Sequence, residues 1–312
     1  MFGFGVDIGG TTVKIGLVDE NGCIIEKSVF PTPTNYESFI EEISKRIKKI
    51  LKNNNLQVEN LLGIGVGCPG VVDSNGIILS SCNLNLTNAN LKEGLLKEFS
   101  TKIKVSNDAN CAIMAEVKFG SAKGYRNAVM LTLGTGVGGG VVIDGKLFEG
   151  GNSTGAELGH FTLVANGEQC SCGRKGCVEQ YVSTSSIIKN AKKEMLNEKD
   201  SSLWKAVSKN LDLLDGIMVF NEAKKGDKTA LKVVDNFINY LADTIMSYNN
   251  VFRPEIFILG GGVSAQGDYI IEKVVNKCER FNYGYKGAPI PKITCATLYN
   301  DAGIVGAFSL IV

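Results

Sequence analysis

Hydrophobic and polar residues alternate along this chain in patterns that predict a mixed α/β fold. Over residues 36–52, apolar side chains recur every three or four positions, which predicts an amphipathic helix with its stripe at Phe39, Ile40, Ile43, Ile47, Ile50 and Leu51. Short continuous apolar runs predict buried strands at LLGIGV, IKVSN and EIFIL. Further helices are expected over 90–99, 109–120, 185–197, 202–212 and 228–251, with a closing helix over 302–312.

One arrangement of strands and turns occurs twice. Residues 6–18 and 129–143 each consist of an apolar strand, a turn rich in Gly and Thr, and a second apolar strand. Helices and strands follow each of them. We therefore expect two similar α/β halves, with a hinge near residues 118–125.

The composition indicates a folded chain without an affinity for polyanions. The chain has 312 residues, of which 44% are hydrophobic and 21% are charged, unlike a disordered segment. Its 33 basic side chains almost balance its 32 acidic ones, so no field would hold nucleic acid or anionic lipid. No apolar run approaches the ~18 residues of a membrane span, and no signal peptide opens the chain, so we expect a cytoplasmic location.

Three of the nine cysteines stand close together in the sequence. The only histidine, His160, precedes Cys170, Cys172 and Cys177 within 18 residues. One imidazole and three thiols form a closed tetrahedral zinc site of the structural kind, because no position stays open for water. Chance clustering of buried cysteines is the alternative. The spacing favours structural zinc.

The glycine-rich turns match no familiar nucleotide motif in its proper context. G-x-G-x-x-G occurs over 65–70 and 134–139, but the first match contains Pro69 and the second runs into a strand instead of a helix. The segment 140–147 resembles a phosphate-binding P-loop, but Leu147 stands where Ser or Thr would reach magnesium.

The two turns instead predict paired nests of backbone N–H groups for phosphate oxygens, although each could be an ordinary glycine hairpin. Lys14 can supply charge, Asp7 can hold hydrated Mg²⁺, and the segment LGGGVS can let an adenine lie against bare backbone. The expected contacts to ATP are Asp7, Gly9, Gly10, Thr11, Thr12, Lys14, Thr132, Gly134, Thr135, Gly136, Gly138, Gly139, Gly261 and Gly262.

Asp108 lies between a predicted strand and a predicted helix, in the segment VSNDAN. A carboxylate at this point can face a substrate site, or it can cap the helix that follows. The residues alone leave these two roles open.

Five segments together give a family resemblance: DIGGTTVKIG, NDAN, LGTGVGGG, GAELGH and CSCGRKGCVE. The chain resembles, over essentially its whole length, the ROK family (repressor, open reading frame, kinase) of the actin-like ATPase superfamily. The resemblance implies an α/β fold of two actin-like, ribonuclease H-like domains around a cleft. The small domain would comprise 1–118 and 300–312, and the large domain 119–299 with the zinc-binding loop.

The resemblance also implies an activity. Most members are ATP-dependent sugar kinases that use Mg²⁺, and a homodimer is expected. The family's repressors carry a helix-turn-helix domain before the first phosphate loop, which begins here at residue 7. We therefore expect a kinase rather than a non-enzymatic sugar sensor. A protein kinase is excluded because the HRD and DFG elements are absent.

The resemblance assigns roles to particular residues. Asp108 would be the base for the 6-hydroxyl of a hexose, and His160 would bind zinc through one nitrogen and sugar through the other. The sugar contacts implied are Asn83, Asn107, Asp108, Glu157, His160 and Glu179. Many family glucokinases read P-N-L-P-G-W where this chain reads Cys82-Asn83-Leu84-Asn85-Leu86-Thr87. The asparagine is kept but the proline and tryptophan are missing, which leaves the choice of hexose open. Glucose remains the favoured substrate, with N-acetylmannosamine, fructose and allose as alternatives.

Overall fold

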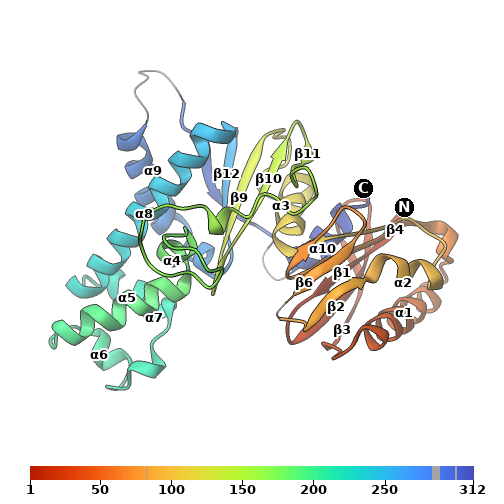
Figure 1. Ribbon diagram of the computed structural model, residues 1–312, viewed down its shortest axis with the longest axis horizontal. Helices are drawn as coiled ribbons and strands as arrows, with labels where there is room; N and C mark the ends of the chain where they lie inside the picture. The colour runs from red at the N-terminus through yellow and green to blue at the C-terminus, as the bar shows by residue number, and fades with distance from the viewer. Residues whose placement is uncertain (82, 283–288, 299–300) are drawn as a thin grey trace. The chain divides into compact units, whose positions relative to one another are not determined.

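The computed structural model describes residues 1–81, 83–282, 289–298 and 301–312 (Figure 1). The chain divides into two compact units. The first comprises Met1–Ala128, Gly140–Ala156 and Thr297–Val312, and the second comprises Val129–Gly139 and Glu157–Ala296. The expected boundary at 118/119 falls ten residues before the first segment ends, and the one at 299/300 lies outside the described residues.

The first unit is built on a five-stranded mixed sheet in the order β3-β2-β1-β4-β8. Strands β1 and β2 and strands β2 and β3 pair antiparallel, whereas β4 pairs parallel with both β1 and β8. The strands are β1 (Phe2–Ile8), β2 (Thr12–Asp19), β3 (Ile24–Pro31), β4 (Leu61–Cys68) and β8 (Ile103–Asn107).

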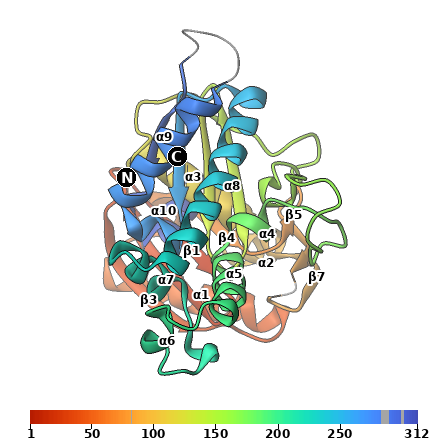
Figure 2. The same cartoon turned by 90° about the vertical axis from the view of Figure 1, so that its left-hand side faces the viewer.

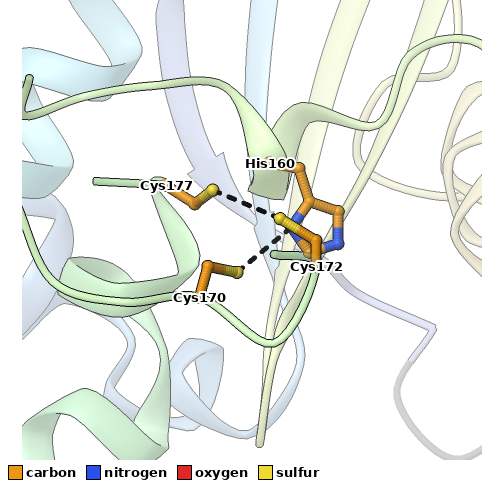
Figure 3. Close-up of side chains that lie close together, drawn as sticks. All are labelled: His160, Cys170, Cys172 and Cys177. Carbon is orange, nitrogen blue, oxygen red and sulfur yellow. Dashed lines mark hydrogen bonds between the residues drawn. The ribbon is translucent and has the colours of Figure 1, made fainter. Parts of the chain in front are cut away.

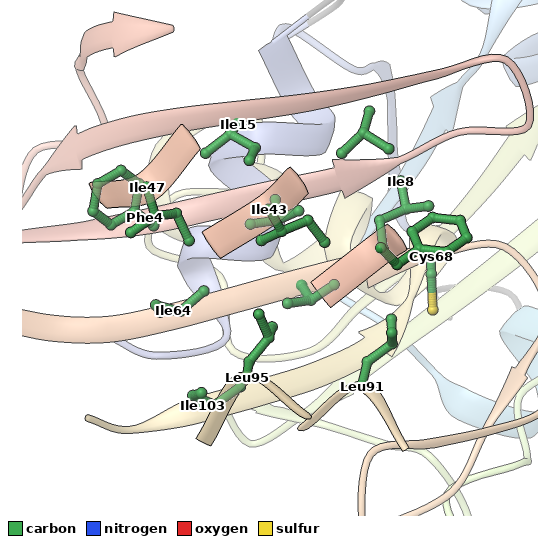
Figure 4. Packing of buried hydrophobic residues seen from close by; sticks show 14 of the residues in the cluster. Phe4, Ile8, Ile15, Ile43, Ile47, Ile64, Cys68, Leu91, Leu95 and Ile103 are labelled. Atoms are coloured by element: carbon green, nitrogen blue, oxygen red, sulfur yellow. The ribbon is translucent and has the colours of Figure 1, made fainter. Parts of the chain in front are cut away.

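One face of this sheet packs against two helices, α1 (Tyr36–Asn53) and α2 (Leu91–Glu98). Phe4 and Ile8 of β1 meet Ile43 and Ile47 of α1 in a fully buried core (Figure 4). The helix expected over 36–52 is therefore confirmed, and its apolar stripe is the face that the sheet covers. Asn35 caps the helix by accepting from the backbone N–H of Ser38 at 3.0 Å.

Glycines alternate with large apolar residues along β1. They face the side of the sheet opposite to α1 and α2. A Cβ atom at Gly5 would overlap the carbonyl of Ile304, and one at Gly65 of β4 would overlap that of Ala307. Both carbonyls belong to the closing helix α10 (Ala302–Ser309), which also packs against α3 (Asp108–Phe119). The absent side chains let the backbone of α10 lie directly on the sheet.

A small antiparallel sheet of β5 (Val71–Val72), β6 (Ile77–Ser81) and β7 (Leu86–Asn90) belongs to the same unit. The sequence patterns did not predict it, because its short strands are interrupted by polar residues. The unit also contains residues 140–156, since Gly140 lies against Ile113 of α3.

The second five-stranded sheet has the order β11-β10-β9-β12-β13. Its strands are β9 (Ala128–Leu133), β10 (Val137–Ile143), β11 (Lys146–Leu147), β12 (Ile256–Gly260) and β13 (Lys292–Cys295). The helices of the second unit are α4 (Glu179–Val182), α5 (Thr184–Asn197), α6 (Leu203–Ala206), α7 (Gly216–Lys224), α8 (Lys228–Phe252) and α9 (Asp268–Phe281), seen from a second side in Figure 2.

The helix expected over 202–212 is wrong. Helix α6 ends at Ala206, and Ser208 and Lys209 then adopt left-handed backbone angles, with φ of 48° and 63°. Two consecutive residues in this region end a right-handed helix. A separate 3₁₀ turn follows at Leu211–Leu213. Across the described residues, none of the helices combines the length and apolar character needed to cross a bilayer.

Candidate functional site

The four sequence-predicted metal ligands lie together in the second unit (Figure 3). Their ligand atoms all lie within 4.8 Å of one another. The Nδ1 atom of His160 is 3.6 Å from Cys170 Sγ, and Cys172 Sγ is 3.7 Å from Cys177 Sγ. Tetrahedral zinc with Zn–S bonds of about 2.3 Å separates its sulfur ligands by about 3.8 Å. The cluster therefore fits the size and donor preference of zinc.

Backbone contacts hold the loop that carries the cysteines. The N–H of Cys170 donates to Arg174 O at 2.9 Å, which closes a turn around Cys172. Gly176 has φ of 77°, and a Cβ there would overlap the carbonyl of Val164. Only glycine fits this position beside Cys177 without strain. The backbone of the loop thus sets the positions of the cysteines.

Burial raises the pKa of the Cys177 thiol to about 12, whereas the backbone N–H of Arg174 lowers the pKa of Cys172. A thiol with the pKa of Cys177 keeps its proton at neutral pH. A bound cation supplies the charge that would stabilise its thiolate.

The 3₁₀ turn Leu158–His160 is anchored from α8. The hydroxyl of Tyr248, which is buried, donates to the carbonyl of Leu158. The ring of Phe161 packs edge-on against Tyr248 at a centroid distance of 5.6 Å. Tyr248 therefore fixes the segment that presents Glu157 and His160. Nothing in the sequence pattern singled it out.

The first glycine turn joins β1 to β2. The N–H of Gly9 donates to Thr12 O at 2.9 Å, and Thr32 donates its hydroxyl to Gly9 O at 2.6 Å. Thr32 also donates its backbone N–H to Thr11 O at 3.0 Å. The turn is thus braced by the residue that follows β3. Asn83 is exposed and lies close to Gly10, since a Cβ at Gly10 would be 3.7 Å from Asn83 Cβ.

Asp7 and Lys14 lie opposite each other on β1 and β2, with 3.7 Å between Lys14 Nζ and Asp7 Oδ2. Burial raises the pKa of Asp7, and the Lys14 ammonium opposes that shift. A Cβ at Gly303 of α10 would overlap the Asp7 carboxylate, so the helix approaches it closely. A half-buried carboxylate beside one lysine is a suitable oxygen ligand for a hard cation.

The second glycine turn joins β9 to β10 at Gly134, Thr135 and Gly136. Gly134 O accepts from the N–H of Thr184 at 2.8 Å, and Thr135 O accepts from the hydroxyl of Ser185 at 2.7 Å. The carbonyls of the turn are therefore bound by the start of α5. The other expected contacts here, Thr132, Gly138 and Gly139, lie within the strands and not in the turn.

A cavity of about 260 Å³ lies beside Gly262, at the end of β12. It is lined by Ile188, Ile217, Phe220 and Val263, with Thr184 and Gln266 among its polar groups. Gly261 has φ of 75°, and a Cβ there would press on the backbone of Leu133. The space and its apolar walls suit a flat aromatic ring.

Asn107 is the N-cap residue of α3 and directly precedes Asp108, for which the sequence left a capping role open. Its Oδ1 accepts from the N–H of Ala109 at 2.8 Å, and its Nδ2 donates to Gly70 O at 2.9 Å. Asp108 is the first residue of the helix; its Oδ1 accepts from the same N–H at 2.8 Å, and its side chain is exposed at the end of β8. The capping position belongs to Asn107.

A partly buried network that the sequence did not reveal involves residues on both sides of Asp108 in the chain. The Ser106 hydroxyl donates to Glu149 Oε1 at 2.8 Å, and Asn110 Nδ2 donates to the same oxygen at 3.2 Å. Glu149 comes from the segment after β11, far along the chain. The network fixes the end of β8 and the first turn of α3.

The ROK family model matches residues 3–312 of the chain. The chain belongs to the ROK family. This ROK protein is 36% identical to a glucokinase of Thermotoga maritima, over 98% of its own length and 96% of that protein. The structure of a ROK family glucokinase from Streptomyces griseus, in complex with glucose and AMPPNP, matches with a TM-score of 0.82 at 30% identity over 99% of both chains. A ROK hexokinase from Thermus thermophilus matches with a TM-score of 0.83 at 28% identity, over 100% and 98% of the two chains. The expected actin-like α/β fold is therefore confirmed.

Proposed function

We propose that this ROK protein is an ATP-dependent hexose kinase that phosphorylates the 6-hydroxyl of glucose. The main observation behind this proposal is the position of Asp108. Its exposed carboxylate lies directly after β8, on the first residue of α3, which Asn107 caps. The similarity to glucokinases over nearly the whole chain supports the choice of reaction and of sugar.

Asp108 would act as the general base. The sugar 6-oxygen attacks the γ-phosphorus, the bond to the β–γ bridging oxygen breaks, and the hydroxyl proton passes to the Asp108 carboxylate. Phosphoryl transfer depends mainly on positioning and on neutralising charge, so the base must be held in place. The network of Ser106, Asn110 and Glu149 supports that requirement.

Both glycine turns would receive phosphate oxygens on backbone N–H groups, and Lys14 would add positive charge. Asp7 would offer an oxygen to Mg²⁺, which supplies neutralisation of the phosphate charge when bound. The cavity beside Gly262 would take the adenine, since apolar side chains and the two glycines Gly216 and Gly262 are among its lining residues.

Recognition of the sugar would use polar side chains, because each sugar hydroxyl both donates and accepts hydrogen bonds. Following the family resemblance, we assign this role to Asn83, Asn107, Asp108, Glu157, His160 and Glu179. The Nδ1 atom of His160 faces Cys170, so the other ring nitrogen would serve the sugar.

The Cys–His cluster would hold zinc in a structural role. Three thiolates and one imidazole complete a tetrahedron, which leaves no position for a substrate or for water. The cluster would fix the loop between His160 and Glu179.

Release of ADP from Mg-ATP by the purified protein tests this function. The sugars are glucose, mannose, fructose, allose and N-acetylmannosamine, each assayed with zinc present. We expect rapid turnover of glucose above all other sugars. Turnover of N-acetylmannosamine, fructose or allose instead would support the kinase activity but show that glucose is not the substrate. Silence with every sugar would point to a sugar sensor.

A further inference from the structure

The carboxylate of Glu179 lies against the second glycine turn. Its Oε2 atom accepts a hydrogen bond from the backbone N–H of Val137 at 3.1 Å. A Cβ atom at Gly136 would overlap the same oxygen, so the glycine leaves the space that the carboxylate fills. We infer that Glu179 is a positioning residue that ties this turn to the Cys–His cluster, so that zinc binding orders the turn.

The backbone of Glu179 is fixed by the cluster. It follows Cys177 by two residues, and Cys177 pairs with Thr162 in a short antiparallel bridge. The N–H of Val178 donates to Phe161 O at 2.9 Å, next to His160. A cation that holds His160 and Cys177 together would therefore hold the start of α4 as well.

The rest of the turn depends on the same stretch of chain. Thr184 and Ser185, which bind the carbonyls of Gly134 and Thr135, begin α5 directly after α4. Residues 179–185 thus bind the chain at and just after the turn: Glu179 accepts from the N–H of Val137. Thr184 and Ser185 donate to the carbonyls of the turn. Residues 179–185 begin two residues after Cys177, the last metal ligand. A cluster held rigid by zinc would therefore restrict the motion of these residues and, through them, of the turn.

A role in sugar binding does not account for these contacts. Glu179 Oε1 lies 3.9 Å from Cys170 Sγ, but a cysteine that ligates a cation has no thiol proton to donate. The tie therefore rests on Oε2 and the Val137 N–H. Oε1 keeps its lone pairs, so Glu179 could accept a sugar hydroxyl as well. The two roles differ in what they predict when no sugar is present.

The test is a thermodynamic cycle on the full chain, with Mg-AMP-PNP as the probe and no sugar. Its affinity is measured for the wild type and for Glu179→Ala, each with zinc and after removal of zinc by EDTA. We expect zinc removal to weaken binding by the wild type roughly 10-fold, the effect of losing one charged hydrogen bond. Glu179→Ala should bind as weakly with zinc as the zinc-free wild type, and zinc should then have no further effect.

Two variants serve as controls. Glu179→Gln keeps an acceptor for Val137 and should restore the dependence on zinc. Glu168→Ala removes a carboxylate from the same loop that pairs with Lys189 at the surface, and should behave as wild type. An equal effect of zinc in wild type and Glu179→Ala would overturn the inference. So would wild-type affinity in Glu179→Ala, the result expected if the residue only binds sugar.

Should zinc removal unfold the chain, hydrogen exchange on the zinc-loaded proteins answers the same question. Glu179→Ala should speed exchange of the Val137 amide, and Glu179→Gln should not. Unchanged exchange in Glu179→Ala would refute the tie. The nucleotide part rests on the proposed function: a wild type that binds no Mg-AMP-PNP overturns both, whereas binding that ignores zinc overturns this inference alone.

Discussion

Glu116 is a fully buried carboxylate near the end of α3, and its replacement should lower the free energy of unfolding. Its Oε1 accepts from the backbone N–H groups of Thr297 and Leu298, at 2.8 and 3.0 Å. Its Oε2 accepts from the N–H of Ser121 at 2.7 Å and from the Thr297 hydroxyl at 3.1 Å. One side chain thus holds the segment after α3 and the segment that begins at residue 297.

Glu116→Ala would leave three backbone N–H groups without their acceptor. A buried donor without a partner costs about 1–3 kcal/mol, and these three donors are partly buried, so we expect a loss of about 3 kcal/mol in the free energy of unfolding. Glu116→Gln should cost less, about 1–2 kcal/mol. Its amide NH₂ can donate to the Thr297 hydroxyl oxygen, and only the N–H of Ser121 then lacks an acceptor.

Urea unfolding followed by circular dichroism measures these losses. The single tryptophan, Trp204, lies in the second unit, so hydrogen exchange at Ser121, Thr297 and Leu298 provides the local probe. Glu98→Ala is the matched control, because its surface ion pair with Lys48 contributes about 1 kcal/mol or less. A loss below about 1 kcal/mol in Glu116→Ala, with exchange unchanged, would refute this reasoning.

Three further predictions concern single positions. Burial raises the pKa of Asp7 in the folded state, so its charge destabilises the fold above that pKa and not in acid. Asp7→Asn should therefore raise the melting temperature at neutral pH, by an amount that vanishes below about pH 4, while ADP release is lost; a lower melting temperature would contradict this. Tyr248→Phe, which removes the donor to Leu158, should cost about 1 kcal/mol in urea unfolding, and an unchanged midpoint would show that the contact contributes nothing. Cys172→Ser should lose its zinc to a chelator that leaves the wild type loaded, as metal analysis would show, and retention equal to wild type would remove Cys172 from the ligand set.

The sequence predicted the elements whose signal is local. The stripe of α1 is apolar because one face of that helix meets the sheet, and the pattern alone located it to within one residue. The Cys–His cluster was equally accessible, because its four ligands fall within 18 residues and a short loop must bring them close.

The features that the sequence missed depend on partners far along the chain. Glu116 looks like any helical glutamate until residues 297 and 298 pack against it. Tyr248 looks like a core aromatic, and its hydroxyl gains a role only through the carbonyl of Leu158. The helix expected over 202–212 failed for a related reason, because residues 203–213 carry no Pro or Gly to mark the left-handed pair at Ser208 and Lys209.

The sequence located Asp108 but left its role open, and in the structure its Oδ1 shares the N–H of Ala109 with Asn107. A residue between a strand and a helix can cap or catalyse, and the sequence could not separate these roles. The capping position belongs to Asn107, whose amide is occupied at both ends by Ala109 and Gly70. The role of Asp108 in proton transfer remains a proposal that rests on this exposed position.

The central claim is that Asp108 takes the proton from the sugar hydroxyl, and one comparison tests it most directly. Glucose 6-phosphate formation is measured for the wild type and for Asp108→Asn, alongside Mg-AMP-PNP affinity. We expect turnover to fall by roughly 10²–10⁴-fold, while nucleotide affinity and the melting temperature stay at wild-type values. Near-normal phosphorylation of glucose by Asp108→Asn would contradict it.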